Sequence, residues 1–211
     1  MRARLAVLVG VLALIPALRA EDEAAPRRLL LLGPDGKRLA AVARSAAPPG
    51  PDGVPVFDAE AGGETATLAD GVLLLTGPDT GPTVLWGPGL AARRLPDATV
   101  AVGLRLERAV PFGGSLRFDR GGAATSVALS ARRAAAPELV HRTRTDAKGV
   151  WRFEHVGAGT WEVTVRRGDG REQSLGAFTA GQPDTERTLV PGSRVEGQLR
   201  DGDAGEPTGV G

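Results

Sequence analysis

Short apolar runs alternate along the chain with clusters of glycine, proline and aspartate. The clearest run is 160–166, in which one tryptophan and two valines occupy every second position between polar residues. A period of two places one set of side chains on the core face of a strand and the other set in water. The pattern predicts ten strands: 29–32, 39–42, 72–75, 83–86, 100–106, 116–118, 126–131, 150–156, 160–166 and 187–190.

Turn residues separate these runs. Segment 145–149 contains an aspartate that can accept bonds from backbone amides and a glycine that can take a positive φ, so it predicts a tight turn. The glycines of 157–159 predict a hairpin that joins 150–156 and 160–166 as adjacent antiparallel strands. Segment 45–64, rich in alanine, proline and glycine, predicts a long loop or an excursion along a sheet edge.

Many short strands with turn signals between them predict an all-β fold made of sandwiches. Residues 114–127 match residues 197–210 at six of fourteen positions without a gap, a spacing of 83 residues. A period of this length suits a small sandwich domain and is too long for a solenoid. We therefore predict tandem units: a first, irregular sandwich at 27–107, a second at 108–192, and the start of a third at 193–211. The third unit also predicts that the chain is part of a longer polypeptide.

The amino terminus has the order of a secretory signal. Two arginines precede the apolar run 5–18, a small-residue cleavage zone follows, and an acidic cluster begins at Glu21. The run is shorter than the roughly 20 apolar residues that span a bilayer. We predict a signal peptide at 1–20, cleavage after Ala20, a polar lead-in at 21–26, and no membrane span in the mature chain.

The segment around 145–163 carries a Thr-Asp turn, a glycine, two alternating aromatics, a glycine and a third aromatic: Thr145, Asp146, Gly149, Trp151, Phe153, Gly159 and Trp161. This pattern resembles the carboxypeptidase regulatory-like family of transthyretin-like sandwiches. The resemblance implies an immunoglobulin-like β-sandwich of about seven strands, of a kind that usually acts as a non-catalytic module in exported or surface proteins.

Composition narrows the function further. The 26 basic residues nearly balance the 25 acidic ones, so neither a nucleic-acid footprint nor a polybasic membrane patch is indicated. With no cysteine and only two histidines, the chain offers no thiolate nucleophile, no disulfide and no zinc site of the usual kind. Export without disulfides is typical of a bacterial envelope or secreted protein. We predict no enzyme activity, no cofactor and no metal site.

Two histidines and one tryptophan remain as candidates. Neither His141 nor His155 lies in a metal-binding motif, so both are interpreted as strand or loop residues. The aromatics at 151, 153 and 161 are interpreted as core, whereas Trp86, flanked by glycines, could present its ring to a sugar. We predict a structural or interaction module that acts through spacing, presentation or binding of a protein or polysaccharide partner. The alternative is a carbohydrate-binding accessory module of a larger exported enzyme.

Overall fold

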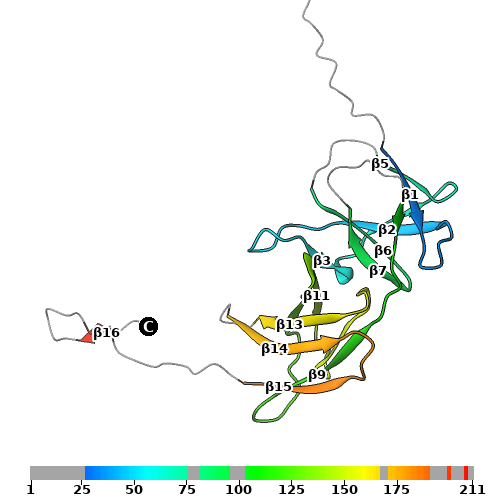
Figure 1. Cartoon of the computed structure of the whole chain (residues 1–211). Helices are drawn as coiled ribbons and strands as arrows, with labels where there is room; N and C mark the ends of the chain where they lie inside the picture. Colours follow the sequence, from blue (N-terminus) through cyan, green and yellow to red (C-terminus); the bar gives the residue numbers. More distant parts are fainter. Residues whose placement is uncertain are drawn as a thin grey trace, which may run out of the picture.

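The regular secondary structure of the described residues consists almost entirely of strands (Figure 1). A computed structural model describes residues 27–75, 81–95, 103–166, 171–190, 199–200 and 207–208. Within these ranges the only helical segment is the single turn η1 (Ala59–Ala61), so the all-β prediction is confirmed. The predicted signal peptide at 1–20, the lead-in at 21–26 and most of the predicted third unit at 193–211 lie outside the described residues.

Seven strands form an N-terminal sandwich: β1 (Arg27–Leu32), β2 (Ala41–Ala46), β4 (Glu64–Thr67), β5 (Val72–Leu75), β6 (Thr83–Gly87), β7 (Leu90–Arg94) and β8 (Leu104–Arg105). One sheet has the order β5-β1-β8 and the other β4-β2-β6-β7. Between them lies a core of leucines and one valine, to which β1 contributes Leu29 and Leu31 and β6 contributes Leu85.

The next seven strands form a C-terminal sandwich: β9 (Phe112–Phe118), β10 (Ala128–Arg133), β11 (Ala136–Arg144), β12 (Val150–Phe153), β13 (Thr160–Arg166), β14 (Glu172–Thr179) and β15 (Thr185–Leu189). Its sheets have the orders β12-β9-β15 and β14-β13-β10-β11-β3. Trp151, Phe153 and Trp161 are all buried in the core between these sheets, as the alternating pattern predicts.

The two sandwiches have the same connectivity. In the N-terminal sandwich, β1 pairs antiparallel with β5 and parallel with β8, β2 pairs with β4 and β6, and β6 pairs with β7. In the C-terminal sandwich, β9 likewise pairs antiparallel with β12 and parallel with β15, β10 pairs with β11 and β13, and β13 pairs with β14. Local hydrogen bonds repeat as well: Leu31 N donates to Gly71 O at 2.7 Å, and Leu116 N donates to Gly149 O at 2.8 Å. The strand β16 (Leu199–Arg200) pairs with β17 (Pro207–Thr208) in a separate two-stranded ladder.

One strand breaks this symmetry. The short strand β3 (Val56–Asp58) lies in the sequence between the second and third strands of the N-terminal sandwich, yet it pairs parallel with β11 at the edge of the C-terminal sheet. Figure 1 shows β3 beside β11, where the two sandwiches meet. Of the two predictions for segment 45–64, the edge excursion is therefore the correct one.

The turn at 145–149 forms as predicted. Asp146 Oδ1 accepts hydrogen bonds from the backbone amides of Lys148 and Val150, at 2.8 and 2.9 Å, and Gly149 has a φ of +78°. These contacts fix the direction in which the chain enters β12.

The predicted hairpin at 157–159 is wrong. Strand β12 pairs with β9, whereas β13 pairs with β10 and β14, so the two strands lie in opposite sheets. The connection crosses the core, with Val156 fully buried, and its backbone bonds other segments instead of closing a ladder. Alternation identifies the buried face of each strand but not the strand's partner.

Candidate functional site at the junction of the two sandwiches

Five aromatic and imidazole rings line up where the sandwiches meet, and we call them the junction cluster: Phe57, Trp86, His141, His155 and Trp161. Trp86 belongs to β6, Phe57 to β3, and His141 to β11. Their ring centroids are 4.8 to 5.6 Å apart along the series, in edge-to-face arrangements that favour aromatic attraction. The cluster thus connects the two sandwiches through side-chain contacts.

Backbone hydrogen bonds reinforce this contact. Ala92 N, on β7, donates to His155 O at 2.8 Å, which ties the N-terminal sandwich to the segment that follows β12. The His155 ring also lies 3.1 Å, at Nδ1, from Leu90 O; because a carbonyl can only accept, Nδ1 is the donor. At β3, Val140 N donates to Pro55 O at 2.9 Å. The junction is therefore hydrogen-bonded on two sides as well as packed.

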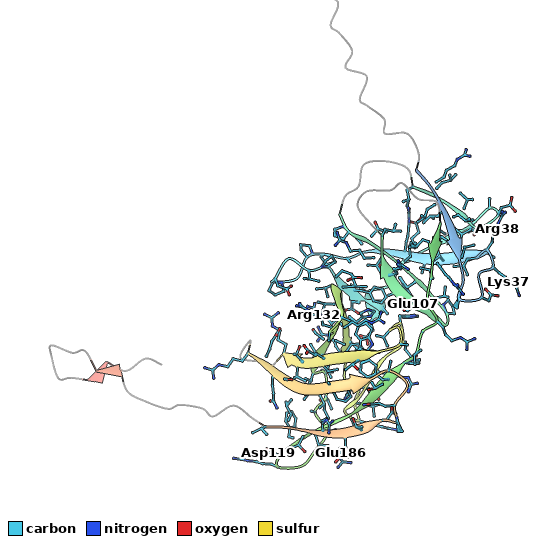
Figure 2. The ribbon with its side chains drawn as sticks, viewed as in Figure 1. Lys37, Arg38, Glu107, Asp119, Arg132 and Glu186 are labelled. Atoms are coloured by element: carbon cyan, nitrogen blue, oxygen red, sulfur yellow. The ribbon has the colours of Figure 1, made fainter. Side chains whose placement is uncertain are left out.

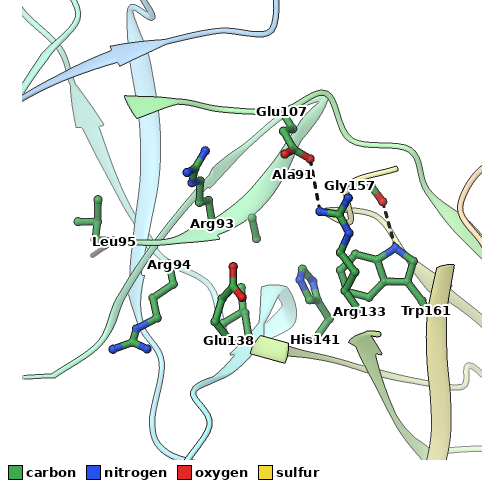
Figure 3. A pocket seen from close by; sticks show the side chains of 12 residues that line it. Ala91, Arg93, Arg94, Leu95, Glu107, Arg133, Glu138, His141, Gly157 and Trp161 are labelled. Atoms are coloured by element: carbon green, nitrogen blue, oxygen red, sulfur yellow. Dashed lines mark hydrogen bonds and ion pairs between the residues drawn. The ribbon is translucent and has the colours of Figure 1, made fainter. Parts of the chain in front are cut away.

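A cavity of about 520 Å³ opens beside the cluster, lined by β7 on one side and by β10, β11 and β13 on the other (Figure 3). Arg93, Arg94, Glu107, Arg133 and Glu138 bring charge to its wall, while Ala91, Leu95, His141 and Trp161 supply its apolar and ring surfaces. The residues that line it include no serine, threonine, cysteine or lysine. The lining therefore presents charges, an imidazole and an indole, and no hydroxyl, thiol or amine nucleophile.

The charged side chains of the cavity are held by neighbours from both sandwiches. Arg133 lies 3.8 Å from Glu107, and Arg93 Nη1 donates to Arg105 O at 2.8 Å. Trp161 Nε1 donates to Gly157 O at 3.0 Å, so the buried indole has its polar atom satisfied. Figure 2 places Glu107 between the two sandwiches, and Lys37 and Arg38 on the N-terminal sandwich.

Burial lowers the pKa of His141 from its ordinary value of 6.5 to about 3, and the charge of His155 contributes in the same direction. His141 is only 4% exposed, so the charged imidazolium loses its hydration there. At neutral pH the ring is uncharged and packs as an aromatic side chain between Phe57 and Trp161. His141 is a buried residue of β11, in line with the interpretation of both histidines as strand or loop residues.

Trp86 lies within β6 and is half-buried, with its ring against Phe57 and His155. Its indole Nε1 is buried and has no hydrogen-bond partner among the described residues. Gly63 lies against this atom: a Cβ built at position 63 would be 3.2 Å from Nε1 and 2.8 Å from Arg44 O. The residue predicted as a possible ligand contact, Trp86, therefore lies within the junction cluster, between His155 and Phe57.

Sequence reasoning identified Trp86, Trp161 and the two histidines singly and did not bring them together. It missed Phe57 altogether, although Val56 and Phe57 form an isolated apolar pair within a segment rich in proline and glycine. Such a pair is a signal for a short buried element. Among the described residues, no group of three or more histidine, aspartate or glutamate side chains could hold a metal ion. Within the same ranges, no helix has the length and apolar character needed to cross a bilayer.

No family model and no curated protein sequence matches the chain. Similar solved structures include a streptococcal ancillary pilin, at 15% identity and a TM-score of 0.32, over 80% of this chain and 62% of that one. The Bacillus anthracis TIE protein matches at 14% identity and a TM-score of 0.32, over 79% of this chain and 33% of that one. The shaft pilin SpaA of Lactobacillus rhamnosus GG matches at 10% identity and a TM-score of 0.36, over 81% and 99%. This chain thus spans less than two thirds of the first two proteins, and the assignment of its fold rests on its own strand pairing.

Proposed function

We propose that the chain is a non-catalytic structural and interaction module of an exported bacterial protein, in which two sandwich units, 27–107 and 108–192, are held as one rigid body. The observation that carries the proposal is the pairing of β3 with β11. A segment of the first unit adds a strand to the sheet of the second, so the units cannot rotate freely without breaking a ladder. Flexibly linked domains lack such a shared strand.

Three further features support a rigid spacer. The junction cluster packs rings from both units, Asp52 of the β3 segment forms an ion pair with Arg132 of β10, and Ala92 bonds the backbone of His155. The repeated connectivity of the sandwiches supports division into tandem units. We also propose that the second unit is a relative of the carboxypeptidase regulatory-like modules, on the strength of its seven strands and of the Asp146 turn.

The exported location rests on the predicted signal peptide. The test is to express the full gene in a bacterial host and to measure the mass of the product found outside the cytoplasm. The expected product is a chain that begins at Glu21. A product that retains residues 1–20 or stays in the cytoplasm would contradict this part of the proposal.

The coupling of the two units is testable with one substitution. Phe57→Ala removes the ring between Trp86 and His141 at a buried site, where loss of a phenylalanine side chain costs about 3 to 5 kcal/mol. Calorimetry is expected to show one unfolding transition in the unaltered protein and two in this variant. Phe118→Ala makes the same change at an exposed ring on β9 and is expected to keep a single transition. Two independent transitions in the unaltered protein would refute the rigid-body proposal.

The carbohydrate-binding alternative has one observation in its favour: Trp86 is only half-buried, so part of its side chain is exposed. The exposed part of an indole ring can stack on a sugar. Retention on insoluble polysaccharides, compared between the unaltered protein and Trp86→Ala, tests this alternative. Retention that depends on Trp86 would support it, and equal retention or none in both proteins would remove it.

A further inference from the structure

A second cavity, of about 450 Å³, lies on the outer face of the five-stranded sheet, away from the junction cluster. Its floor is β10, and its walls are side chains of β11 and β13. The turn at 50–52 borders one end, where Asp52 pairs with Arg132. Figure 2 shows Arg132 on the side of the sheet toward this turn. We call this cavity the outer groove.

Strand register brings arginines together at the other end of the outer groove. Ala128 on β10 stands opposite both Arg144 on β11 and Arg166 on β13. Paired residues on neighbouring strands have Cβ atoms about 4.5 to 5.5 Å apart, so both guanidinium groups can reach the space above the small alanine. In the next row, Ser130 stands between Arg142 and Thr164. The floor is therefore shallow and bordered by cationic and hydroxyl groups.

The charges of the groove are unevenly distributed. Arg132 is balanced by Asp52 and stands opposite Glu162. The opposite end holds three arginines, and Glu172 on β14 is the acidic residue paired in register with one of them. None of the three, Arg142, Arg144 and Arg166, forms an ion pair or hydrogen bond within the described part of the chain. Among the described residues, this end thus carries a local excess of unpaired positive charge.

We propose that the outer groove binds an acidic polysaccharide, with a carboxylate held between Arg144 and Arg166 above Ala128. Guanidinium groups suit this ligand because they form paired hydrogen bonds with carboxylates. Arg142, Ser130 and Thr164 then face the hydroxyl groups of the neighbouring sugar. The binding of such a polymer adds to the structural role proposed above and does not depend on it.

The position of the groove favours a polysaccharide over an acidic peptide. Extended peptides bind sheets mainly by adding a strand at an edge, where backbone N–H and C=O groups are free. The outer groove runs over β10, an interior strand whose backbone is already paired on both sides. A ligand here meets only side chains, so it must carry its own hydrogen-bonding groups along its length, as a sugar chain does.

The test is binding of the full protein to polygalacturonate, measured by calorimetry at low salt, with dextran as the neutral polymer and polyglutamate as the acidic peptide. Arg144→Ser with Arg166→Ser is expected to weaken binding to polygalacturonate by at least about tenfold, since hydrogen bonds to charged groups are strong. The matched control, Arg117→Ser with Arg152→Ser, removes the same charge from the opposite sheet and is expected to change affinity by less than about twofold. All four arginines are substantially exposed, and equal melting temperatures would verify folding.

A conservative double variant, Arg144→Lys with Arg166→Lys, keeps the charge but loses the paired geometry, and it is expected to bind with intermediate affinity. Three results would overturn the proposal: no binding of polygalacturonate by the unaltered protein, equal losses in the groove and control variants, or equal binding of dextran. Preference for polyglutamate would assign the groove to acidic peptides instead and would also overturn it. None of these results affects the calorimetric test of the rigid junction.

Discussion

The two sandwiches share one connectivity but differ in what fills them. The described core of the N-terminal sandwich contains leucines and a valine and no aromatic ring. The core of the C-terminal sandwich holds five rings: Phe112, Trp151, Phe153, Trp161 and Phe178. The same strand order thus arises from two different core compositions. The shared topology therefore does not depend on which apolar side chains fill the core.

One pair of equivalent positions shows how the backbone adapts. In the N-terminal sandwich Leu29 stands opposite Leu73, and in the C-terminal sandwich Gly114 stands opposite Trp151. The glycine leaves room for the indole: a Cβ at position 114 would be 3.1 Å from the Trp151 ring and only 2.2 Å from Thr185 O. In the C-terminal sandwich a large residue on one strand is therefore paired with a glycine on the next strand. In the N-terminal sandwich two leucines of similar size occupy the equivalent positions.

The largest expected effect comes from an aromatic core position. Trp161→Ala is expected to lower the free energy of unfolding by about 3 to 5 kcal/mol, because it empties a buried site and removes the bond to Gly157 O. Glu162→Ala, on the exposed face of the same strand, is expected to change it by less than about 0.5 kcal/mol. Denaturant titration measures both. Similar values for the two variants would mean that the buried and exposed faces are exchanged.

The free energy of unfolding is also expected to decrease as the pH falls, because His141 is buried in its neutral form. The folded-state pKa of about 3 lies below the ordinary 6.5, so the unfolded chain takes up a proton first as the pH falls. The stabilisation is complete above about pH 6.5 and is lost progressively toward pH 3, with a loss on the order of 3 kcal/mol at pH 4.

Comparison with His141→Phe isolates this contribution, because the variant keeps a ring against Phe57 and Trp161 and cannot titrate. Carboxylates act in the same direction in both proteins: the hydrogen bond from Arg132 lowers the pKa of Asp52, for example. The unfolding free energy of the variant is expected to decline less between pH 7 and pH 4. Parallel pH profiles would show that His141 is not buried in its neutral form.

Substitutions at the equivalent positions Gly114 and Leu29 test the comparison of the two cores directly. Gly114→Ala is expected to cost about 1 to 3 kcal/mol because the added methyl group meets the backbone oxygen of Thr185. Adding Trp151→Leu to this variant is expected to restore little stability, since the severe clash, at 2.2 Å, is with the backbone oxygen of Thr185, and the contact with the indole, at 3.1 Å, is the milder one. At the equivalent position Leu29→Ala is expected to cost about 2 to 5 kcal/mol by leaving a cavity. Tolerance of alanine at position 114 would mean that β9 and β15 are farther apart than described.

Strands with a clear alternation of apolar and polar residues were predicted from the sequence. The strands that were missed have polar residues at buried positions or lie at a sheet edge. The bounds of β13 were predicted correctly at 160–166. Strand β11 was missed because its inward positions include His141 and Thr143, while Val140 on the other face is also buried, beside its register partner Val56 on β3. Strands β4, β7 and β14 are edge strands, and β14 has a single fully buried side chain, Phe178.

The junction was beyond the reach of sequence patterns for a different reason. Phe57, Trp86 and His141 are far apart in the chain, and only the parallel pairing of β3 with β11 brings them together. Local periodicity carries no information about such a pairing. The same limit explains the wrong hairpin at 157–159, where the buried face was predicted correctly and the partner strand was not.

The most direct test of the rigid junction is the distance between the two sandwiches in solution. The chain has no cysteine, so one introduced at Thr67 on β4 and one at Thr188 on β15, both exposed, can carry spin labels without background. Pulsed electron resonance is expected to give a single narrow distance distribution, which broadens when Phe57→Ala is added. A broad or multiple distribution in the unaltered background would contradict the claim that β3 and the junction cluster hold the two units as one body.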